Sequence, residues 1–354
     1  MNLTWRRIVL SLSPIWAVLT SLLLGAGLII AAGANPITAY YAIFMGAFSD
    51  IWGINSTLLK TIPLMFAGVA VALAFKGGYF NIGIGGQIFL GGIGAALAGL
   101  YLKGLPPVLH IFLAFLAGFI TGGVWSLVPG YLKAARGVNE IITCIFMHFI
   151  AYYFLEYMAS GPLMELGAPA PMSPEIAKSA QLPIIIPNTD VHLGLIFAMA
   201  LAVILQVVFK KTTIGYQITA TGLNPTACRY AGMNTVRNII ILSFVSGGLA
   251  GMAGASEIMG LKHRLFGSMP FLYGLEAIAI VFLAKTNPIG VMIGSLFLGA
   301  LRSGAEMMQR SIGVPTDLAR AIEGFVILFV AISIALPQWR PDWFKERIDS
   351  EKIN

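Results

Sequence analysis

Long stretches of apolar residues, separated by short polar segments, run through almost the whole chain. A segment of about 20 apolar residues is long enough to cross the hydrocarbon core of a bilayer. Helices satisfy their own backbone hydrogen bonds there. The pattern therefore predicts an all-α polytopic membrane protein of about ten transmembrane helices, within a range of about 8–10. The predicted spans are residues 15–34, 58–75, 87–102, 107–131, 139–158, 191–209, 238–257, 272–284, 289–305 and 320–336.

The polar segments between these runs predict the orientation of the chain. Basic residues gather before the first run, at 210–237, and in the tail 337–354. Cytoplasmic loops carry an excess of Lys and Arg, so both termini and the 210–237 loop are predicted to be cytoplasmic. The long 159–190 loop contains Glu165, Glu175 and Asp190 but only one lysine, and it is predicted to lie outside. The whole chain, 1–354, is predicted to form a single transmembrane domain.

One loop does not fit this scheme. Lys262, His263 and Arg264 fall on the outer side, where positive charge is least expected. Either a span is miscounted or these cations have a function there. The neighbouring spans 272–284 and 289–305 are short or interrupted by "KTNPIG", which predicts a broken or re-entrant pair.

Composition agrees with a membrane protein. Hydrophobic residues make up 58% of the chain and charged residues 10%, whereas soluble domains have about 25% charged residues. The net charge of +7 is spread singly or in small groups between apolar runs, which argues against a nucleic-acid partner. Small residues recur at four-residue intervals and predict close helix contacts. They are Gly91–Ala95–Gly99, Gly118–Gly122, Gly247–Gly251–Ala255 and Gly290–Gly294.

Enzyme motifs are missing from the sequence. It contains no H-E-x-x-H, no G-x-S-x-G, no His or Cys pair at metal-ligand spacing and no phosphate-binding P-loop. We therefore predict a protein that is not an enzyme, that has no metal or other cofactor of its own and that does not hydrolyse ATP itself.

The segment "GGYFNIGIGGQ", residues 77–87, places glycines and amides between two apolar runs. It is not a dinucleotide-binding turn, because Ile88 stands where the third glycine would be. Irregular backbone in a membrane must be buried in protein or line a cavity. We predict a substrate pathway here, with Asn81 and Gln87 as uncharged hydrogen-bonding groups and Tyr79 and Phe80 as an apolar face. The alternative is a helix-packing turn.

A second candidate for this pathway is Glu276, inside the apolar stretch "LYGLEAIAI". Ionisable residues within membrane spans are usually functional. Other carboxylates, such as Glu140, Glu257 and Glu306, fall near the predicted span ends, where helix capping or contact with the polar interface explains them.

The stretch "TATGLNPTACRYAGMN", residues 219–234, has the pattern of a turn, a short helix and a stop. Asn224 can cap the helix, Pro225 suits its first turn and Gly232 can end it. Its surface of alanines and glycines suits insertion into a cleft of another protein. The alternative is an ordinary cytoplasmic loop.

These segments resemble known transport proteins. "ATGLNPTACRYAGMN" is similar to the coupling loop of ABC-importer permeases of the branched-chain amino acid and simple-sugar class. "GGYFNIGIGGQIFLGG" and the stretch from Thr286 to Phe329 resemble the nucleoside and simple-sugar subgroup, and the long outer loop resembles the longer of its two paired permeases.

The resemblance implies the larger-bundle importer fold in a bacterial cell membrane and import of nucleosides or, less favoured, a simple sugar. It implies three partners: a cytoplasmic ABC ATPase, a second permease and an external substrate-binding lipoprotein. ATP would be bound by the ATPase. The expected ATPase contacts are Gly222, Asn224, Pro225, Ala227, Ala231 and Gly232. Lys262 and Arg264 are expected to help dock the lipoprotein.

Two other classes remain as alternatives from the residues alone. An ion-coupled secondary transporter of a small polar solute would need a titratable cluster at the midplane, and few such charges are visible. A non-transporting membrane scaffold would need no polar pathway at all.

Overall fold

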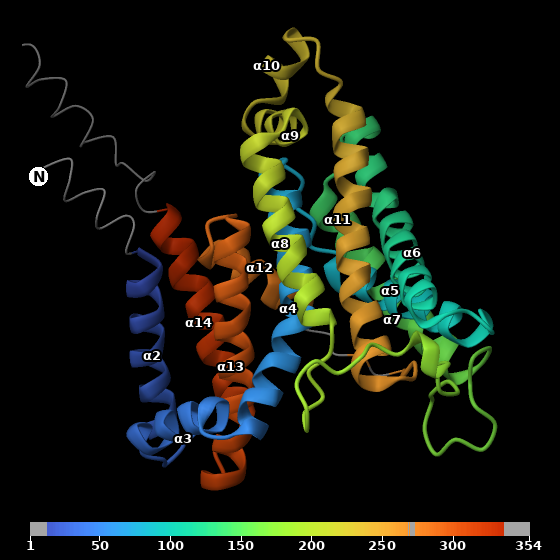
Figure 1. Cartoon of the computed structure of the whole chain (residues 1–354). Helices are drawn as coiled ribbons and strands as arrows, with labels where there is room; N and C mark the ends of the chain where they lie inside the picture. Colours follow the sequence, from blue (N-terminus) through green and yellow to red (C-terminus); the bar gives the residue numbers. More distant parts are fainter. Residues whose placement is uncertain (1–12, 268, 270–272, 336–354) are drawn as a thin grey trace, which may run out of the picture. The chain divides into compact units, whose positions relative to one another are not determined.

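The computed structural model describes residues 13–267, 269 and 273–335, and its regular structure is helical (Figure 1). Over these residues the only β-type pairing is two isolated bridges, Met172 with Phe266 and Ile184 with His192. The predicted all-α class is therefore confirmed. The chain forms two compact units, Met1–Gly46 with Gly304–Asn354, and Ala47–Ser303.

The first unit begins with a bent helix pair. Helix α2, Ser13–Ala31, and helix α3, Pro36–Phe48, meet at 115°, either as a broken span or as a re-entrant loop. The Tyr40 hydroxyl on α3 donates a hydrogen bond to the Leu22 carbonyl on α2, 2.5 Å away. The C-terminal part of α13, Pro288–Ile312, and helix α14, Thr316–Ala335, complete this unit. The predicted span 15–34 thus omitted α3.

The second unit contains the other long helices. Seven described helices are long and apolar enough to cross a membrane, or eight if α2 and α3 are one broken span. Helix α12 has only 11 residues, which agrees with the short span predicted there. Both chain ends lie outside the described residues. Besides the N-terminal part of α13 and two short helices described below, the α-helices of this unit are α4 (Ile51–Lys76), α5 (Ile84–Tyr101), α6 (Pro107–Arg136), α7 (Glu140–Ser160), α8 (Gly194–Lys211), α11 (Thr235–Glu257) and α12 (Tyr273–Leu283).

Helices α5, α6 and α11 cross at glycines. A Cβ at Gly91 would overlap the Gly251 backbone, and a Cβ at Gly251 would overlap the Gly118 carbonyl. Across the same crossing, Gly122 faces the Gly247 carbonyl. Small residues allow this close backbone approach, which gives van der Waals packing between helices in a bilayer. Three of the predicted small-residue ridges therefore do pack helices together.

Gly251→Leu is expected to destabilise the protein strongly, because overpacking a close contact costs about 1–3 kcal/mol or more. Its thermal midpoint in detergent should fall well below that of the wild type. Gly27→Ala is the control, since nothing lies within 4 Å of a Cβ at Gly27. An unchanged midpoint for Gly251→Leu would contradict the packing seen here.

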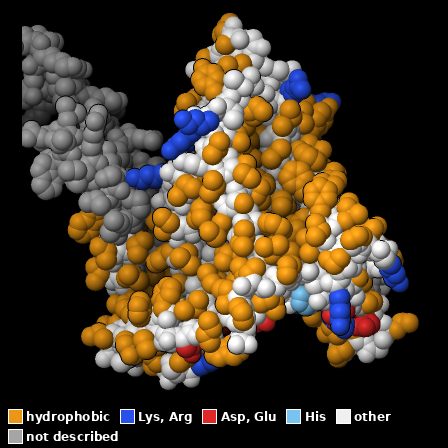
Figure 2. Space-filling model, viewed as in Figure 1, with side chains coloured by type: hydrophobic (Ala, Val, Ile, Leu, Met, Phe, Trp, Pro, Cys, Tyr) orange, Lys and Arg blue, Asp and Glu red, His pale blue; other side chains and the backbone are white. Residues whose placement is uncertain are grey.

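The two ends of the second unit differ in character. One end, here called the hairpin end, contains the segment between α8 and α11; the other, the loop end, contains residues 161–193 and 258–267. Figure 2 shows a mostly hydrophobic surface between them, with Lys and Arg concentrated toward the ends. An apolar belt between charged ends is the surface expected of a membrane-spanning bundle.

The loop with the three unexpected cations belongs to the loop end. The Ser173 amide donates to the Leu265 carbonyl and the Ile176 amide to the His263 carbonyl, both at 2.9 Å. Arg264 forms an ion pair with Glu165, and Glu175 lies 4.0 Å from its guanidinium. The cations therefore share an end with the long acidic loop, whose carboxylates balance Arg264. Lys262 remains exposed.

His192 is buried at the loop end, just before α8. It packs against Gly260 in a short π-helical segment, η2, Ile258–Lys262, and its Nδ1 accepts a hydrogen bond from the Gly194 amide at 3.2 Å. Burial and, to a lesser extent, the nearby His263 lower the pKa of His192 from 6.5 to about 4. The folded protein thus holds this imidazole neutral.

This lowered pKa predicts a loss of stability in acid. The unfolded chain binds a proton at His192 before the folded chain does, so stability is complete above pH 6.5 and falls as the pH drops toward 4. At about 1.4 kcal/mol per pKa unit, the loss is on the order of 3 kcal/mol. Thermal unfolding between these pH values should show it, with a smaller slope for His192→Gln. Equal slopes for both proteins would contradict the prediction.

Candidate functional site

Two short helices form the hairpin between α8 and α11. They are α9, Thr213–Leu223, and α10, Pro225–Tyr230. The Asn224 side chain caps α10 by accepting a hydrogen bond from the Ala227 amide at 3.0 Å, and Pro225 is its first residue. Gly232 follows the helix with φ of +78°, a conformation that suits glycine. The predicted turn, short helix and stop are confirmed.

The surface of α10 is largely free of contacts within this chain. Ala227, Ala231 and Gly232 are exposed, as expected of a surface that fits a cleft. Two large apolar side chains accompany them: Leu223 is 82% exposed and Tyr230 is 91% exposed. The tip of the hairpin thus exposes apolar side chains as well as small ones.

The hairpin contacts the end of α4 through glycine. A Cβ at Gly222 would overlap the Lys76 carbonyl and lie 2.9 Å from the backbone of Gly77 and Gly78. In return, a Cβ at Gly78 would lie 3.0 Å from the Gly222 Cα. The hairpin and the glycine segment are thus in contact through their backbones, although Gly77 and Gly222 are 145 positions apart in the sequence.

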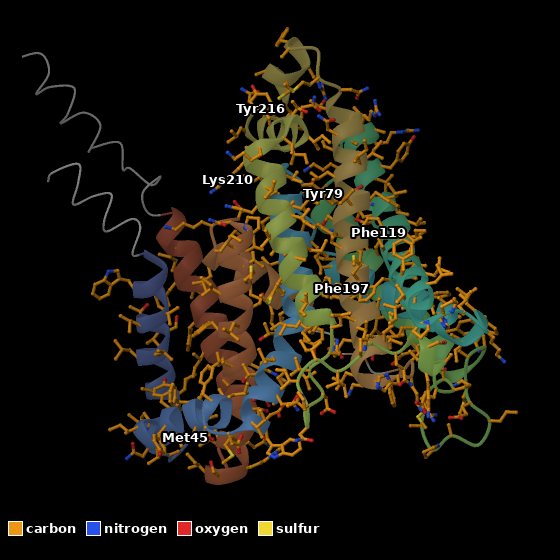
Figure 3. All side chains as sticks on the ribbon, viewed as in Figure 1. Met45, Tyr79, Phe119, Phe197, Lys210 and Tyr216 are labelled. Atoms are coloured by element: carbon orange, nitrogen blue, oxygen red, sulfur yellow. The ribbon has the colours of Figure 1, made fainter. Side chains whose placement is uncertain are left out.

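The glycine segment is irregular between α4 and α5, as predicted, although its last residues, from Ile84, already belong to α5. Gly78 has φ of +75°, which lets the chain leave α4. Tyr79 is buried in the interior (Figure 3), whereas Phe80 is 46% exposed. The two aromatic residues predicted to share one apolar face therefore point into different surroundings.

Asn81 and Gln87 form a buried amide pair. The Asn81 Nδ2 donates to Gln87 Oε1 at 2.9 Å, and the Gln87 Nε2 donates to Asn81 Oδ1 at 2.8 Å. Asn81 also donates to the Ser246 hydroxyl on α11 at 3.0 Å, which in turn donates to the Ala70 carbonyl on α4. The pair therefore connects α4, α5 and α11. Its role in a substrate pathway stays a prediction.

Lys133 and Glu140 hold the same segment from α6 and α7, a role that the sequence analysis did not predict. They form an ion pair with each other. The Lys133 ammonium donates to the Gly78 carbonyl at 2.8 Å and lies 5.8 Å from the Tyr79 ring centre. Opposite charges on the two sides of the short α6–α7 turn are the sequence signal from which this ion pair could have been predicted.

A small aromatic-lined cavity of about 160 Å³ adjoins the glycine segment. Its walls include Ile82 and Gly85 from that region and His148 and Phe149 from α7. The His148 ring lies 5.6 Å from the ring of Phe89 and 5.8 Å from that of Phe149. The sequence pattern did not predict these two α7 residues as part of the site.

Glu276 lies elsewhere, within a buried charged cluster. Its carboxylate pairs with Arg302 at 2.8 Å, and the guanidinium lies 5.0 Å from the Tyr273 ring centre. The Tyr273 hydroxyl donates to Glu257 at 3.4 Å. Glu276 thus has a partner within the protein and is not brought together with Asn81 and Gln87. Among the described residues, no group of three His, Cys, Asp or Glu could hold a metal.

Many packed apolar helices, a broken segment and an exposed helical hairpin at one end are the features of a multi-pass membrane protein. The chain belongs to the family described as branched-chain amino acid transport system / permease component, whose model matches residues 53–331.

Relatives agree with this family. The chain is 34% identical to the guanosine ABC transporter permease protein NupP of Bacillus subtilis, covering 92% of this chain and 94% of that one. It is 33% identical to the glucose ABC transporter permease protein TsgB13 of Haloferax volcanii, covering 93% and 89%. A second Bacillus subtilis guanosine permease protein, NupQ, is 25% identical over 71% of this chain and 80% of its own length.

The protein is therefore the permease subunit of an ABC importer, and it is not an enzyme, because ATP is hydrolysed by a separate subunit. Membership of this family argues against both alternative classes, an ion-coupled secondary transporter and a non-transporting scaffold. The presence of two permeases, NupP and NupQ, among the relatives supports a partner permease beside the ATPase.

Proposed function

We propose that this permease imports nucleosides, with a simple sugar as the second candidate. The observation that carries the proposal is the similarity to NupP, a guanosine permease protein, over almost the whole chain. The similarity to TsgB13, a glucose permease protein, keeps the sugar as the alternative. A nucleoside adds an aromatic base to a sugar, so the two candidates differ in their need for an aromatic contact.

The proposed pathway follows the glycine segment and the residues predicted there. Tyr79, Phe80, Asn81 and Gln87 border it, and the cavity beside His148 and Phe149 offers ring faces on which a base can stack. Neutral amides suit an uncharged substrate, because they donate and accept hydrogen bonds without a counter-ion. Glu276 lies apart from these residues, and we propose that it contributes to the pathway from its own position, where it is paired with Arg302.

The hairpin is proposed to contact the ATPase. In this arrangement α10 enters a cleft of the ATPase through Gly222, Asn224, Pro225, Ala227, Ala231 and Gly232. The hairpin end and both termini then lie on the cytoplasmic side of a bacterial cell membrane, and residues 1–354 act as one transmembrane domain of the larger-bundle type. The cations of the hairpin end, including Lys210, Lys211 and Arg237, support this orientation.

The remaining partners complete the importer. A second, homologous permease is proposed to form a heterodimer with this chain, and an external lipoprotein is proposed to deliver the substrate to the loop end. Exposed Lys262 supports docking there, because a cationic rim speeds encounter with an acidic partner. Arg264 contributes through the surface that it forms with Glu165.

Uptake measurements on cells test the substrate. Cells that lack this chain should lose uptake of labelled guanosine and other nucleosides and regain it when the gene is restored. Loss of labelled glucose or ribose uptake with nucleoside uptake intact would favour the sugar. No change in any of these would contradict the proposal.

A further inference from the structure

A deep crevice follows one side of helix α8. Two cavities, of about 1000 Å³ and about 910 Å³, separate this helix from α6 and α11. Leu201 and Ile204 line both of them, so the two cavities adjoin along α8, and together they are here called the α8 crevice. It runs from the loop end to the hairpin end of the bundle.

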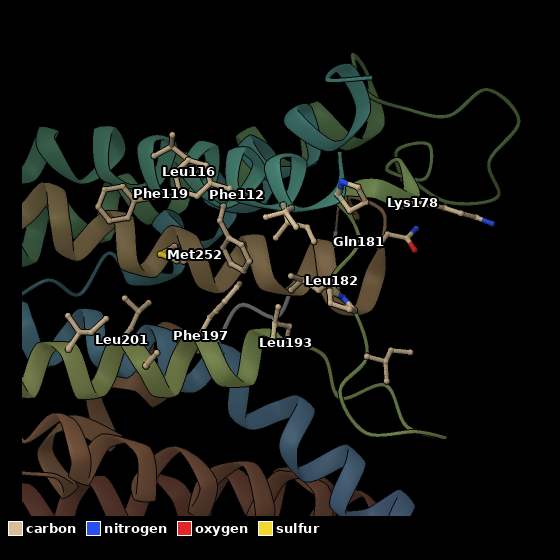
Figure 4. Close-up of a pocket in the computed structure, with 18 residues that line it drawn as sticks. Phe112, Leu116, Phe119, Lys178, Gln181, Leu182, Leu193, Phe197, Leu201 and Met252 are labelled. Atoms are coloured by element: carbon tan, nitrogen blue, oxygen red, sulfur yellow. The ribbon is translucent and has the colours of Figure 1, made fainter. Parts of the chain in front are cut away.

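The walls of the larger cavity are almost entirely apolar. Aromatic rings from α6 and α8 line it together with Met252 of α11 (Figure 4). These rings are Phe112, Phe115, Phe119 and Phe197. Phe112 is 61% exposed and Ile204 is 56% exposed, so the crevice opens onto the apolar surface of the bundle.

The charged residues that line the crevice are all cationic. Lys178 lies at the loop end and Arg237 at the hairpin end, and the described lining residues include no Asp or Glu. Beside Arg237 the wall is polar, with Gln217, Asn234 and Asn238. The Lys178 side chain extends away from the cavity (Figure 4). The hairpin end is thus the end where a cation and hydrogen-bonding groups line the space.

The occupant must match an apolar interior and a cationic, polar mouth. A nucleoside or sugar would lose its hydrogen bonds to water among the phenylalanine rings, which costs free energy without compensation. Apolar cavities stay free of water and take up apolar molecules instead. A membrane phospholipid satisfies both ends, since basic pockets between transmembrane helices on the cytoplasmic side bind anionic headgroups.

We propose that the α8 crevice binds an anionic phospholipid, with its headgroup at Arg237 and its acyl chains between α8 and α11. The chains pass Leu201 and Ile204 toward Phe119 and Phe197. A lipid held there fills the space that separates α8 from α11, and α8 continues directly into the α9–α10 hairpin. The site does not depend on which substrate is transported.

Native mass spectrometry of the purified full chain, with phosphatidylglycerol or phosphatidylcholine added, tests the proposal. The wild type should retain phosphatidylglycerol in preference to phosphatidylcholine. Arg237→Gln should weaken phosphatidylglycerol binding about fivefold, since one basic residue near the surface contributes about 1 kcal/mol. Lys210→Gln is the matched control. Like Arg237, Lys210 lies at the hairpin end of the bundle, but it is on α8 and its side chain points away from α11 (Figure 3).

A second pair of variants tests the apolar part. Leu201→Trp places a ring where the two cavities join and should reduce retention of both lipids, with an unchanged gel-filtration profile. Val203→Trp is the control, since Val203 is on α8 but lines neither cavity. Equal retention of the two lipids, or no effect of Arg237→Gln and Leu201→Trp, would overturn the proposal. Cross-linking of a cysteine at Ile204 to the partner permease would also overturn it, because a protein would then fill the crevice.

Discussion

Replacing Ala227 by tryptophan is expected to reduce ATP-driven uptake strongly while the protein still folds and inserts. Ala227 is exposed on α10, so we expect a large ring there to leave the fold intact. In a cleft of the ATPase the same ring would overpack a close contact, at a cost of about 1–3 kcal/mol or more. We expect uptake to fall by roughly tenfold or more, which corresponds to about 1.4 kcal/mol of lost coupling.

A matched variant shows whether the position matters or only the bulk. Ala135→Trp adds the same ring at an exposed alanine near the end of α6, where Lys133 contacts Gly78. It lies at the hairpin end but outside the hairpin, and it should leave uptake near the wild-type level. Co-purification of the ATPase separates loss of docking from loss of folding. Normal uptake by a well-expressed Ala227→Trp protein would show that α10 does not enter a cleft.

Asn81→Ala is expected to cause the second large effect, a loss of thermal stability. It removes both hydrogen bonds of the buried Gln87 amide and one to Ser246. Each buried polar group left without a partner costs about 1–3 kcal/mol. Thermal unfolding in detergent measures the loss, and Phe80→Ala, at a half-exposed neighbouring side chain, should change stability much less.

Exchanging the two amides separates the pairing from the pathway. The double variant Asn81→Gln with Gln87→Asn keeps two amides able to bond each other. If pairing is their whole role, stability and uptake per folded molecule should both recover relative to Asn81→Ala. If the amides also contact the substrate, stability should recover while uptake remains impaired. A midpoint for Asn81→Ala equal to that of the wild type would contradict the structural role itself.

The features of the fold that depend on a regular pattern of residues could be predicted from the sequence. Hydrophobic runs predicted the long helices, and the four-residue spacing of small residues predicted close helix contacts, which the crossing of α5, α6 and α11 provides. Helix α3 was missed because its apolar residues directly follow the first run. Asn35 and Pro36 were nevertheless a start signal: the Asn35 side chain accepts a hydrogen bond from the Ile37 amide at 2.9 Å.

The candidate site was predictable only where it is local. The caps of α10 depend on residues three to five positions apart, so Asn224, Pro225 and Gly232 could be assigned from sequence. Contacts between distant segments could not, because no periodicity encodes them. The ion pair of Arg264 with Glu165 and the contact of Gly222 with Gly78 are of this kind.

The contact between Gly222 and Gly78 also determines how movement can pass through the protein. Side chains absorb small displacements by changing rotamer, and a well-packed interface without them transmits strain instead. At this junction backbone lies directly on backbone, with 3.0 Å between the Gly222 Cα and a Cβ position at Gly78. A push on the hairpin from the ATPase would therefore arrive at the start of the glycine segment undamped. An added methyl group on either glycine would force the two backbones apart.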